Sequence, residues 1–164
     1  MEQGDQQLLN RLAERLTARG EMLATAESCT GGWVAKVCTD MAGSSVWFER
    51  GFVTYSNQSK QDMLGVSADT LAGFGAVSEQ VVLEMVRGAL VRSRAQWALA
   101  VSGIAGPSGG TTDKPVGTVW LAWAGPGDWR SSRRCRFEGD RKAVRRQAVH
   151  TVIEVLVQRC QTTE

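Results

Sequence analysis

A short turn after the first predicted strand holds the side chains best suited to covalent chemistry. This turn, residues 27–32, includes Ser28 and Thr30 and lies between an apolar run at 22–26 and a helical pattern at 33–41. Backbone N–H groups at the start of a helix are unpaired and suit an oxyanion or a phosphate. The simpler interpretation is structural, with Ser28 or Thr30 capping the helix and the two glycines that follow allowing close packing. Neither a G-x-S-x-G elbow nor a Walker A pattern is present.

A serine nucleophile needs a base, and the chain offers few. His150, the only histidine, lies in a long helical pattern with no sign of a partner acid. A lysine acts as a base near neutral pH when burial or a neighbouring cation lowers its pKa by about 2 to 4 units. Lys60 follows a polar cluster at a strand end, where α/β folds usually place ligands, although a solvated lysine on a short helix explains the same pattern. The other lysines are Lys36, Lys114 and Lys142.

Three further features lie near predicted strand ends. Tyr55 is the only tyrosine, so its hydroxyl group is a candidate for a role, although a strand-end tyrosine in contact with water is equally ordinary. Ser45 precedes the second strand and either donates to a substrate or makes a turn. The segment 102–115 holds four glycines and two prolines, and it predicts a loop of a length that is often functional in so small a domain.

The densest charge lies between Arg130 and Arg146. A patch for phosphate groups or nucleic acid is one interpretation, and a solvated edge strand protected by charge is the simpler one. The whole chain has 19 Lys and Arg against 17 Asp and Glu, a net charge of +2. We therefore expect no nucleic-acid partner.

Composition argues against several classes of site and location. One histidine and four cysteines without a C-x-x-C pair speak against zinc sites and thioredoxin-type chemistry, so we expect no metal and no cofactor. No run approaches the roughly 18 to 20 apolar residues that span a bilayer. The first residues are polar and periodic where a signal peptide has a basic end and an apolar run. We expect a cytoplasmic protein with free thiols and no membrane partner.

The hydrophobic patterns predict a single compact α/β domain spanning residues 1–164. The chain has 164 residues, of which 43% are apolar, a size and composition suited to one core. Early helices alternate with strands and a hairpin comes late, which predicts a mixed β-sheet flanked by helices. The predicted helices are 8–19, 33–41, 57–65, 79–90 and 140–159, and the predicted strands are 22–26, 46–55, 97–101, 116–124 and 130–137.

Five blocks of sequence, in order, resemble one known family, that of the C-terminal domain of the competence-damage inducible protein CinA. The similarity runs from about Leu8 to the C-terminus and includes Gly139-Asp140-Arg141 and Val144-Arg145. These blocks are more specific for the family than for its activity. They are Ala26-Glu27-Ser28-Cys29-Thr30-Gly31-Gly32, Gly51-Phe52-Val53-Thr54-Tyr55-Ser56-Asn57, Gly75-Ala76-Val77-Ser78, Ser102-Gly103-Ile104-Ala105-Gly106-Pro107 and Lys114-Pro115-Val116-Gly117-Thr118-Val119.

The resemblance implies an amidohydrolase of pyridine nucleotide recycling. Its substrate would be the small molecule nicotinamide mononucleotide, whose carboxamide is hydrolysed to nicotinate mononucleotide and ammonia by a metal-independent Ser/Lys dyad. Ser28 would be the nucleophile, Lys60 its base, and Tyr55 would assist proton movement or hold Lys60. Ser45 and Arg141 match positions of substrate contact. A non-catalytic nucleotide-binding or regulatory module of the same family is the alternative.

Residue chemistry adds further candidates for contact with such a substrate. Backbone N–H groups in the turn 29–32, which includes Thr30, Gly31 and Gly32, would bind the tetrahedral oxyanion. The phosphate needs an anion site, and Arg141, Arg145 or the loop that contains Gly103 and Gly106 could supply it. The exposed tryptophans and the edge hairpin favour self-association, and the resemblance implies it too, so we expect a homo-oligomer, at least a dimer.

Overall fold

The chain folds around one five-stranded β-sheet. The computed structural model describes residues 2–162. The strands are β1 (Leu23–Glu27), β2 (Phe48–Val53), β3 (Trp97–Gly103), β4 (Thr118–Gly125) and β5 (Trp129–Arg136). The α-helices are α1 (Gln3–Arg19), α2 (Trp33–Thr39), α3 (Asn57–Leu64), α4 (Ala68–Phe74), α5 (Glu79–Val91) and α6 (Arg141–Thr162), with a short 3-10 helix, η1 (Ser44–Val46).

The sheet is mixed, which confirms the predicted fold class. Its strand order is β2-β1-β3-β4-β5, with β1 parallel to β2 and β3, and with antiparallel pairing from β3 to β4 and from β4 to β5. The carboxyl ends of β1, β2 and β3 therefore lie at one edge of the sheet. The ladder continues one residue further, because Ser28 N donates to Val101 O and Thr54 N donates to Glu27 O. This edge brings the turn after β1 beside the segment after β2.

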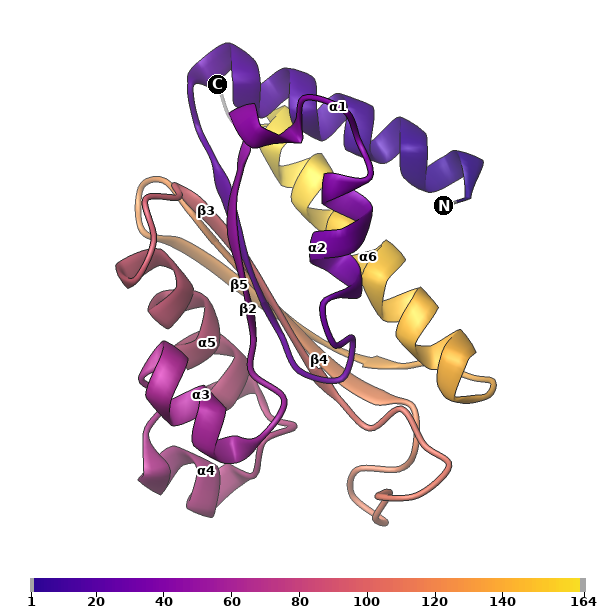
Figure 1. The fold of residues 1–164 in the computed structure, drawn as a ribbon. Helices are drawn as coiled ribbons and strands as arrows, with labels where there is room; N and C mark the ends of the chain where they lie inside the picture. Colours follow the sequence, from indigo (N-terminus) through magenta and orange to yellow (C-terminus); the bar gives the residue numbers. More distant parts are fainter. Residues whose placement is uncertain (1, 163–164) are drawn as a thin grey trace.

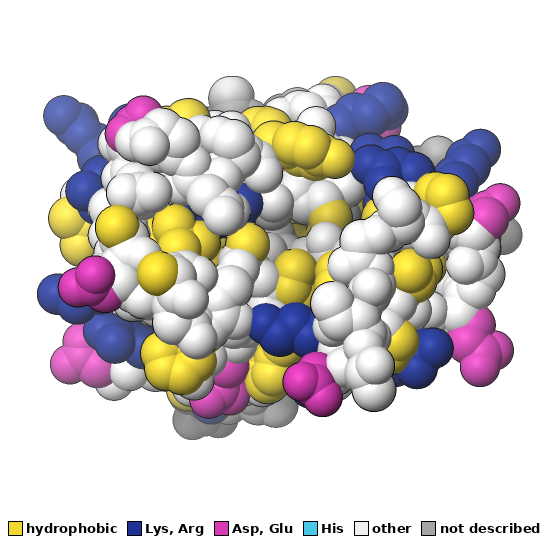
Figure 2. Space-filling model, turned by 90° about the horizontal axis from the view of Figure 1, so that it is seen from below, with side chains coloured by type: hydrophobic (Ala, Val, Ile, Leu, Met, Phe, Trp, Pro, Cys, Tyr) yellow, Lys and Arg dark blue, Asp and Glu magenta, His cyan; other side chains and the backbone are white. Residues whose placement is uncertain are grey.

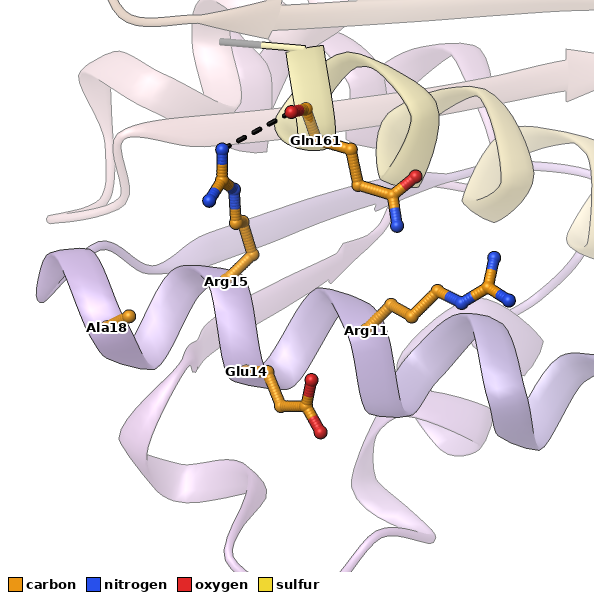
Figure 3. A pocket seen from close by; sticks show the side chains of 5 residues that line it. All are labelled: Arg11, Glu14, Arg15, Ala18 and Gln161. Atoms are coloured by element: carbon orange, nitrogen blue, oxygen red, sulfur yellow. Dashed lines mark hydrogen bonds between the residues drawn. The ribbon is translucent and has the colours of Figure 1, made fainter. Parts of the chain in front are cut away.

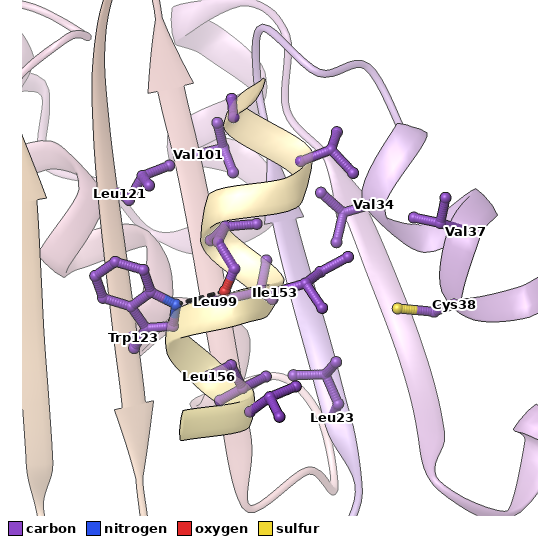
Figure 4. Packing of buried hydrophobic residues seen from close by; sticks show 14 of the residues in the cluster. Leu23, Val34, Val37, Cys38, Leu99, Val101, Leu121, Trp123, Ile153 and Leu156 are labelled. Carbon is purple, nitrogen blue, oxygen red and sulfur yellow. Dashed lines mark hydrogen bonds between the residues drawn. The ribbon is translucent and has the colours of Figure 1, made fainter. Parts of the chain in front are cut away.

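Helices α1, α2 and α6 lie on one face of the sheet (Figure 1). Helix α6 packs on the central strands, and Trp123 Nε1 donates to Val152 O at 2.9 Å (Figure 4). Helix α1 contributes three leucines spaced for one helical face, all fully buried, and it ends at Gly20, whose φ of 64° permits the left-handed C-cap. The buried apolar residues on this face include Leu9, Leu12, Leu16, Leu23, Val34, Leu99, Val101, Leu121, Trp123, Val152, Ile153 and Leu156.

Helices α3, α4 and α5 cover the other face. Ser78 caps α5 by accepting from Val81 N. Gly88 of α5 allows α3 to approach closely, because a Cβ there would lie 2.0 Å from Leu64 O. Helix α3 is thus held against α5 at the same edge where β2 ends.

The structure departs from the predicted elements at α4 and at β2. Helix α4 was not predicted, because its apolar pattern is short and contains Gly73; its only signal is Ser67, whose hydroxyl accepts from Asp69 N. Strand β2 is shorter than 46–55, since its first predicted residues form η1. The segment between β3 and β4 is irregular, as predicted. Within residues 2–162, no helix combines the length and the apolar composition that a bilayer crossing requires.

Candidate active site

A pocket opens at the carboxyl edge of the sheet. Figure 2 views this side of the molecule and shows it hollowed near the middle, with apolar side chains inside and Lys and Arg side chains around the rim. The pocket has a volume of about 210 Å³. It draws on the turn after β1, the start of α3, the segment before α5, the end of β3 and the start of α6. Its lining residues are Ser28, Cys29, Tyr55, Asn57, Lys60, Ala76, Val77, Ser102, Gly103, Ala105 and Arg141.

Ser28 and Lys60 meet at the floor of this pocket. Lys60 Nζ lies 2.9 Å from Ser28 Oγ, 2.8 Å from Thr54 O and 3.2 Å from Tyr55 O. Ser56 starts α3 as its N-cap by accepting from Ser59 N, which places Lys60 one turn into the helix and directs it under β2. Only 1% of Lys60 is exposed. The solvated-lysine interpretation is therefore wrong.

Burial changes the protonation of this lysine. It lowers the pKa of Lys60 from 10.5 to about 8, because the cation loses water and gains no carboxylate partner. A neutral amine keeps two N–H donors and one lone pair. The carbonyl groups of Thr54 and Tyr55 can accept from the two donors, which leaves the lone pair directed at the Ser28 hydroxyl. The arrangement therefore suits Lys60 to take a proton from Ser28.

Glu27 organises the turn, although the sequence analysis assigned it no role. Its carboxylate, on a side chain 1% exposed, accepts from Thr30 Oγ1 at 2.7 Å, from Val34 N at 2.8 Å and from Ala35 N at 3.1 Å. Helix α2 has no side-chain cap at Gly32, so Glu27 satisfies its first N–H groups from the strand end. The interpretation of Ser28 or Thr30 as the helix cap is wrong. The missed signal was a charged residue at the end of an apolar strand.

The turn offers fewer free N–H groups than expected. Ser28 N donates to Val101 O, and Gly31 N donates to Ser28 O. Thr30 is fully buried, so its N–H cannot reach a ligand in the pocket. Cys29 is the residue of this turn after Ser28 that lines the pocket. Burial raises the pKa of its thiol to about 11, so the side chain is a neutral thiol at physiological pH.

Arg141 brings a positive charge to the pocket rim. Its Nη1 donates to Gly106 O at 2.9 Å, and its Nη2 donates to the Tyr55 hydroxyl at 3.1 Å. Tyr55 is 61% exposed and is among the residues that line the pocket. The hydroxyl therefore contacts Arg141, whereas the backbone carbonyl of the same residue contacts Lys60. Gly103 lines the pocket directly, and Gly106 contributes through its carbonyl group.

Four residues expected at the substrate lie on the other side of the turn. Thr30, Gly31, Gly32 and Arg145 line a separate shallow depression of about 530 Å³. Arg145 donates to the carbonyl groups of Cys29 and Thr30, at 3.0 and 3.2 Å, and its guanidinium lies over the Trp33 ring. The structure therefore does not bring these four residues into the pocket that contains Ser28.

Ser45 lies at the opposite end of the sheet. It is exposed in η1, just before β2, where Leu23 N donates to Trp47 O at the start of β1. Because Ser28 follows the other end of β1, one chain cannot bring both serines to the same pocket. The expected substrate contact at Ser45 is not part of this pocket, since β2 runs the length of the sheet between it and Tyr55.

The remaining ionisable groups form no second centre of this kind among the described residues. His150 Nδ1 pairs with Asp5 at 2.6 Å, far along α6 from the pocket. Within residues 2–162, no three His, Cys, Asp or Glu side chains gather as metal ligands. Another surface depression lies between α1 and α6 and includes none of the pocket residues (Figure 3). It is lined by Arg11, Glu14, Arg15, Ala18 and Gln161.

Comparison with known proteins places this chain in a known family. Residues 5–160 match the model of the CinA C-terminal domain. The chain is 59% identical to a protein of Escherichia coli K12 named nicotinamide-nucleotide amidohydrolase PncC, over 93% of this chain and 92% of that one. It is 53% identical to a Pseudomonas putida protein of the same name, over 92% and 94%.

Solved structures agree with the sequence matches. The crystal structure of a competence/damage inducible protein from Agrobacterium tumefaciens superposes with a TM-score of 0.94 at 46% identity, covering 96% of each chain. A CinA superfamily protein from Klebsiella pneumoniae gives 0.92 at 42% identity, covering 98% of this chain and 100% of that one. On these matches, the protein belongs to the CinA C-terminal domain family.

Proposed function

We propose that the protein is a nicotinamide-nucleotide amidohydrolase that hydrolyses nicotinamide mononucleotide to nicotinate mononucleotide and ammonia, as part of pyridine nucleotide recycling. The names of the relatives from Escherichia coli and Pseudomonas putida support the activity. The observation that carries the mechanism is the buried 2.9 Å contact between Ser28 Oγ and Lys60 Nζ. An amide needs a nucleophile and a proton donor for the departing ammonia, and this pair supplies both.

The reaction runs in two halves. In the first, neutral Lys60 takes the proton of Ser28 while Oγ attacks the carboxamide carbon. The tetrahedral intermediate collapses, the C–N bond breaks, and the Lys60 ammonium gives its proton to the departing nitrogen, which leaves an ester on Ser28 and free ammonia. In the second, Lys60 takes a proton from water, which attacks the ester carbon. The Ser28–carboxylate bond breaks, Oγ regains a proton from Lys60, and nicotinate mononucleotide leaves.

Two features, one of the pocket and one of the substrate, favour this course. The N–H of Cys29, the residue after the nucleophile, is the donor from the turn that can face the oxyanion. The pyridinium ring of the substrate is a cation, and its approach further disfavours protonated Lys60. The base is therefore a side chain of the protein, and the mechanism needs no metal or cofactor.

Arg141 is the residue we assign to the substrate phosphate. It is the pocket-lining arginine, and its guanidinium lies at the rim, away from the floor where Ser28 meets Lys60. Arg145 is unsuited because it lines the separate depression on the other side of the turn and does not line the pocket of Ser28. Tyr55 would then orient Arg141 through its hydroxyl and Lys60 through its carbonyl group.

The activity test measures ammonia and nicotinate mononucleotide released from nicotinamide mononucleotide by chelator-treated protein. Wild type should turn over, and Ser28→Ala should lose at least about 10³-fold in kcat. Ser45→Ala is the matched control and should keep near wild-type turnover, because Ser45 lies at the other end of the sheet. Saturable binding without ammonia in any protein would favour a regulatory nucleotide-binding module, and turnover that survives in Ser28→Ala would exclude Ser28 as the nucleophile.

Self-association remains part of the proposal. The exposed side chains that support it differ from those expected from the sequence. Three of the tryptophans are buried, namely Trp47, Trp97 and Trp123. The exposed apolar and aromatic residues on or beside edge strand β2 are Val46, Val53 and Tyr55. Light scattering should give at least the mass of a dimer. A mass near the 17.8 kDa of one chain at assay concentration would contradict it.

A further inference from the structure

Two side chains outside the pocket, Glu27 and Arg145, make hydrogen bonds to the turn that carries Ser28. Glu27, at the end of β1, accepts from one hydroxyl and two backbone N–H groups on the α2 side. Arg145, on α6, donates to two carbonyl groups of the same turn. Neither side chain lines the pocket of Ser28. Both side chains hydrogen-bond to the turn or to the start of α2, and the Arg145 guanidinium also stacks on Trp33, the first residue of α2.

These contacts fix the peptide planes that follow the nucleophile. In a planar trans peptide, the C=O and the next N–H point in opposite directions, so fixing one fixes the other. Arg145 holds the carbonyl groups of Cys29 and Thr30 toward α6. The carbonyl group of Ser28 accepts from Gly31 N, which sets the direction of the Cys29 N–H. Arg145 therefore fixes the peptides that follow Cys29 and Thr30, whereas a hydrogen bond within the turn fixes the peptide between Ser28 and Cys29.

The turn needs this support because its backbone is irregular and two of its residues are glycines. Gly31 and Gly32 have φ values of 59° and 98°, so the chain passes through two consecutive left-handed residues before α2 begins. Glycine is the residue with the greatest backbone freedom, so such a turn keeps one conformation only when other contacts hold it. Glu27 and Arg145 provide those contacts on either side of the two glycines.

We propose that Glu27 and Arg145 are positioning residues, which together hold the turn so that Ser28 Oγ stays within hydrogen-bond reach of Lys60 and the Cys29 N–H faces the oxyanion. This inference rests on the proposed function, because it assigns Ser28 and Lys60 to the chemistry. It changes the role of Arg145 from substrate contact to support of the nucleophile. Displacement of a reacting group by about 1 Å can cost about 10²-fold in rate, so loss of either support should reduce kcat.

The kinetic test compares Arg145→Gln, Arg145→Lys and Glu27→Gln with wild type, using nicotinamide mononucleotide. We expect kcat to fall about 10- to 100-fold in Arg145→Gln, with KM within about threefold. Arg145→Lys should recover part of kcat, because a lysine keeps the positive charge but cannot reproduce the two hydrogen bonds of the guanidinium group to the turn. Arg146→Gln is the matched control: it is the next residue on α6, pairs with Glu2 at the surface, and should leave kcat unchanged.

A second readout is independent of the nucleotide. A small alkyl fluorophosphonate reacts with an activated serine and carries no ring or ribose, so its labelling rate reports on Ser28 alone. Arg145→Gln and Glu27→Gln should be labelled about 10-fold or more slowly than wild type under conditions where circular dichroism shows them folded. If Glu27→Gln fails to fold, the Arg145 pair still decides the outcome.

The outcomes separate this inference from the proposed function. A variant with raised KM, unchanged kcat and unchanged labelling would show that Arg145 binds substrate and would overturn the positioning role. Wild-type protein that neither releases ammonia nor reacts with the fluorophosphonate would overturn the proposed function, and this inference with it.

Discussion

Two regions of the molecule are equally closed to solvent but contain opposite kinds of side chain. Beneath α1 and α6, the buried residues are apolar, among them Leu12, Trp123 and Leu156. At the carboxyl edge of the sheet, Glu27, Thr30 and Lys60 are as deeply buried, with 1%, 0% and 1% of each exposed. In the first region burial stabilises the fold, whereas in the second it removes water from groups that prefer to be solvated.

The difference shows how one small domain supports a reactive site. The apolar region supplies the free energy of folding, and it holds the strands and helices whose ends meet at the pocket. In the polar region, part of that free energy is offset by the burial of a lysine without a carboxylate partner and of a carboxylate that supports a turn. Removing a side chain should therefore affect stability in the first region and catalysis in the second.

The largest effect is expected from Lys60→Met. The methionine keeps most of the volume but has no group to accept the Ser28 proton, so kcat/KM for nicotinamide mononucleotide should fall at least about 10³-fold. Ammonia release at matched folded concentration measures it. Lys36→Met is the control, because Lys36 is exposed on α2 and pairs with Asp40 at the surface. Loss of less than about tenfold in Lys60→Met would remove Lys60 from the mechanism.

The reverse pattern is expected from Leu12→Ala. This leucine is fully buried on the inner face of α1, and its truncation should lower the free energy of unfolding by about 2 to 5 kcal/mol. The kcat of the folded variant should stay near that of wild type, because none of the pocket-lining residues belongs to α1. Urea unfolding measures the change. Leu8→Ala, at a half-buried position of the same helix, should cost less. Equal losses at both positions would contradict the assigned core.

The third expected effect is a pH dependence of the free energy of unfolding, caused by the buried Lys60. The pKa of Lys60 is about 8 in the folded protein, lowered by burial, against 10.5 for the solvated side chain. Between these values the unfolded chain binds the proton that the folded chain has released, so stability rises as pH increases. From below pH 8 to above pH 10.5, wild type should gain on the order of 3 kcal/mol relative to Lys60→Met. Parallel stability curves for the two proteins would show that Lys60 is not destabilised by burial.

The two regions also differ in how well the sequence predicted them. Apolar periodicity indicated the helices under which the first core forms, and the order of helices, strands and hairpin gave the mixed sheet. Ser28 and Lys60 were predicted from residue type and family resemblance, but their 2.9 Å contact depends on β1 and β2 ending side by side. That distance cannot be predicted from any pattern within a short stretch of the sequence.

The residues that pattern and resemblance misplaced show the same limit. Arg145 and Arg141 lie one helical turn apart on α6, yet one contacts the back of the turn and the other the pocket rim. Ser45 is close to β2 in sequence but lies at its amino end. Glu27 was missed because its partners, the first N–H groups of α2, become visible only when the turn is folded.

Direct titration of Lys60 tests the central claim, that burial lowers its pKa far enough for a neutral amine to take the proton of Ser28. The chain has only four lysines, so NMR of the ¹³C-labelled lysine side chains gives few resonances, and Lys60→Arg identifies the one of interest. We predict that this resonance titrates with a midpoint near 8 and that kcat/KM rises with pH through the same midpoint. A Lys60 resonance that stays in its protonated position up to pH 10, in a protein already fully active at pH 7.5, would contradict the account.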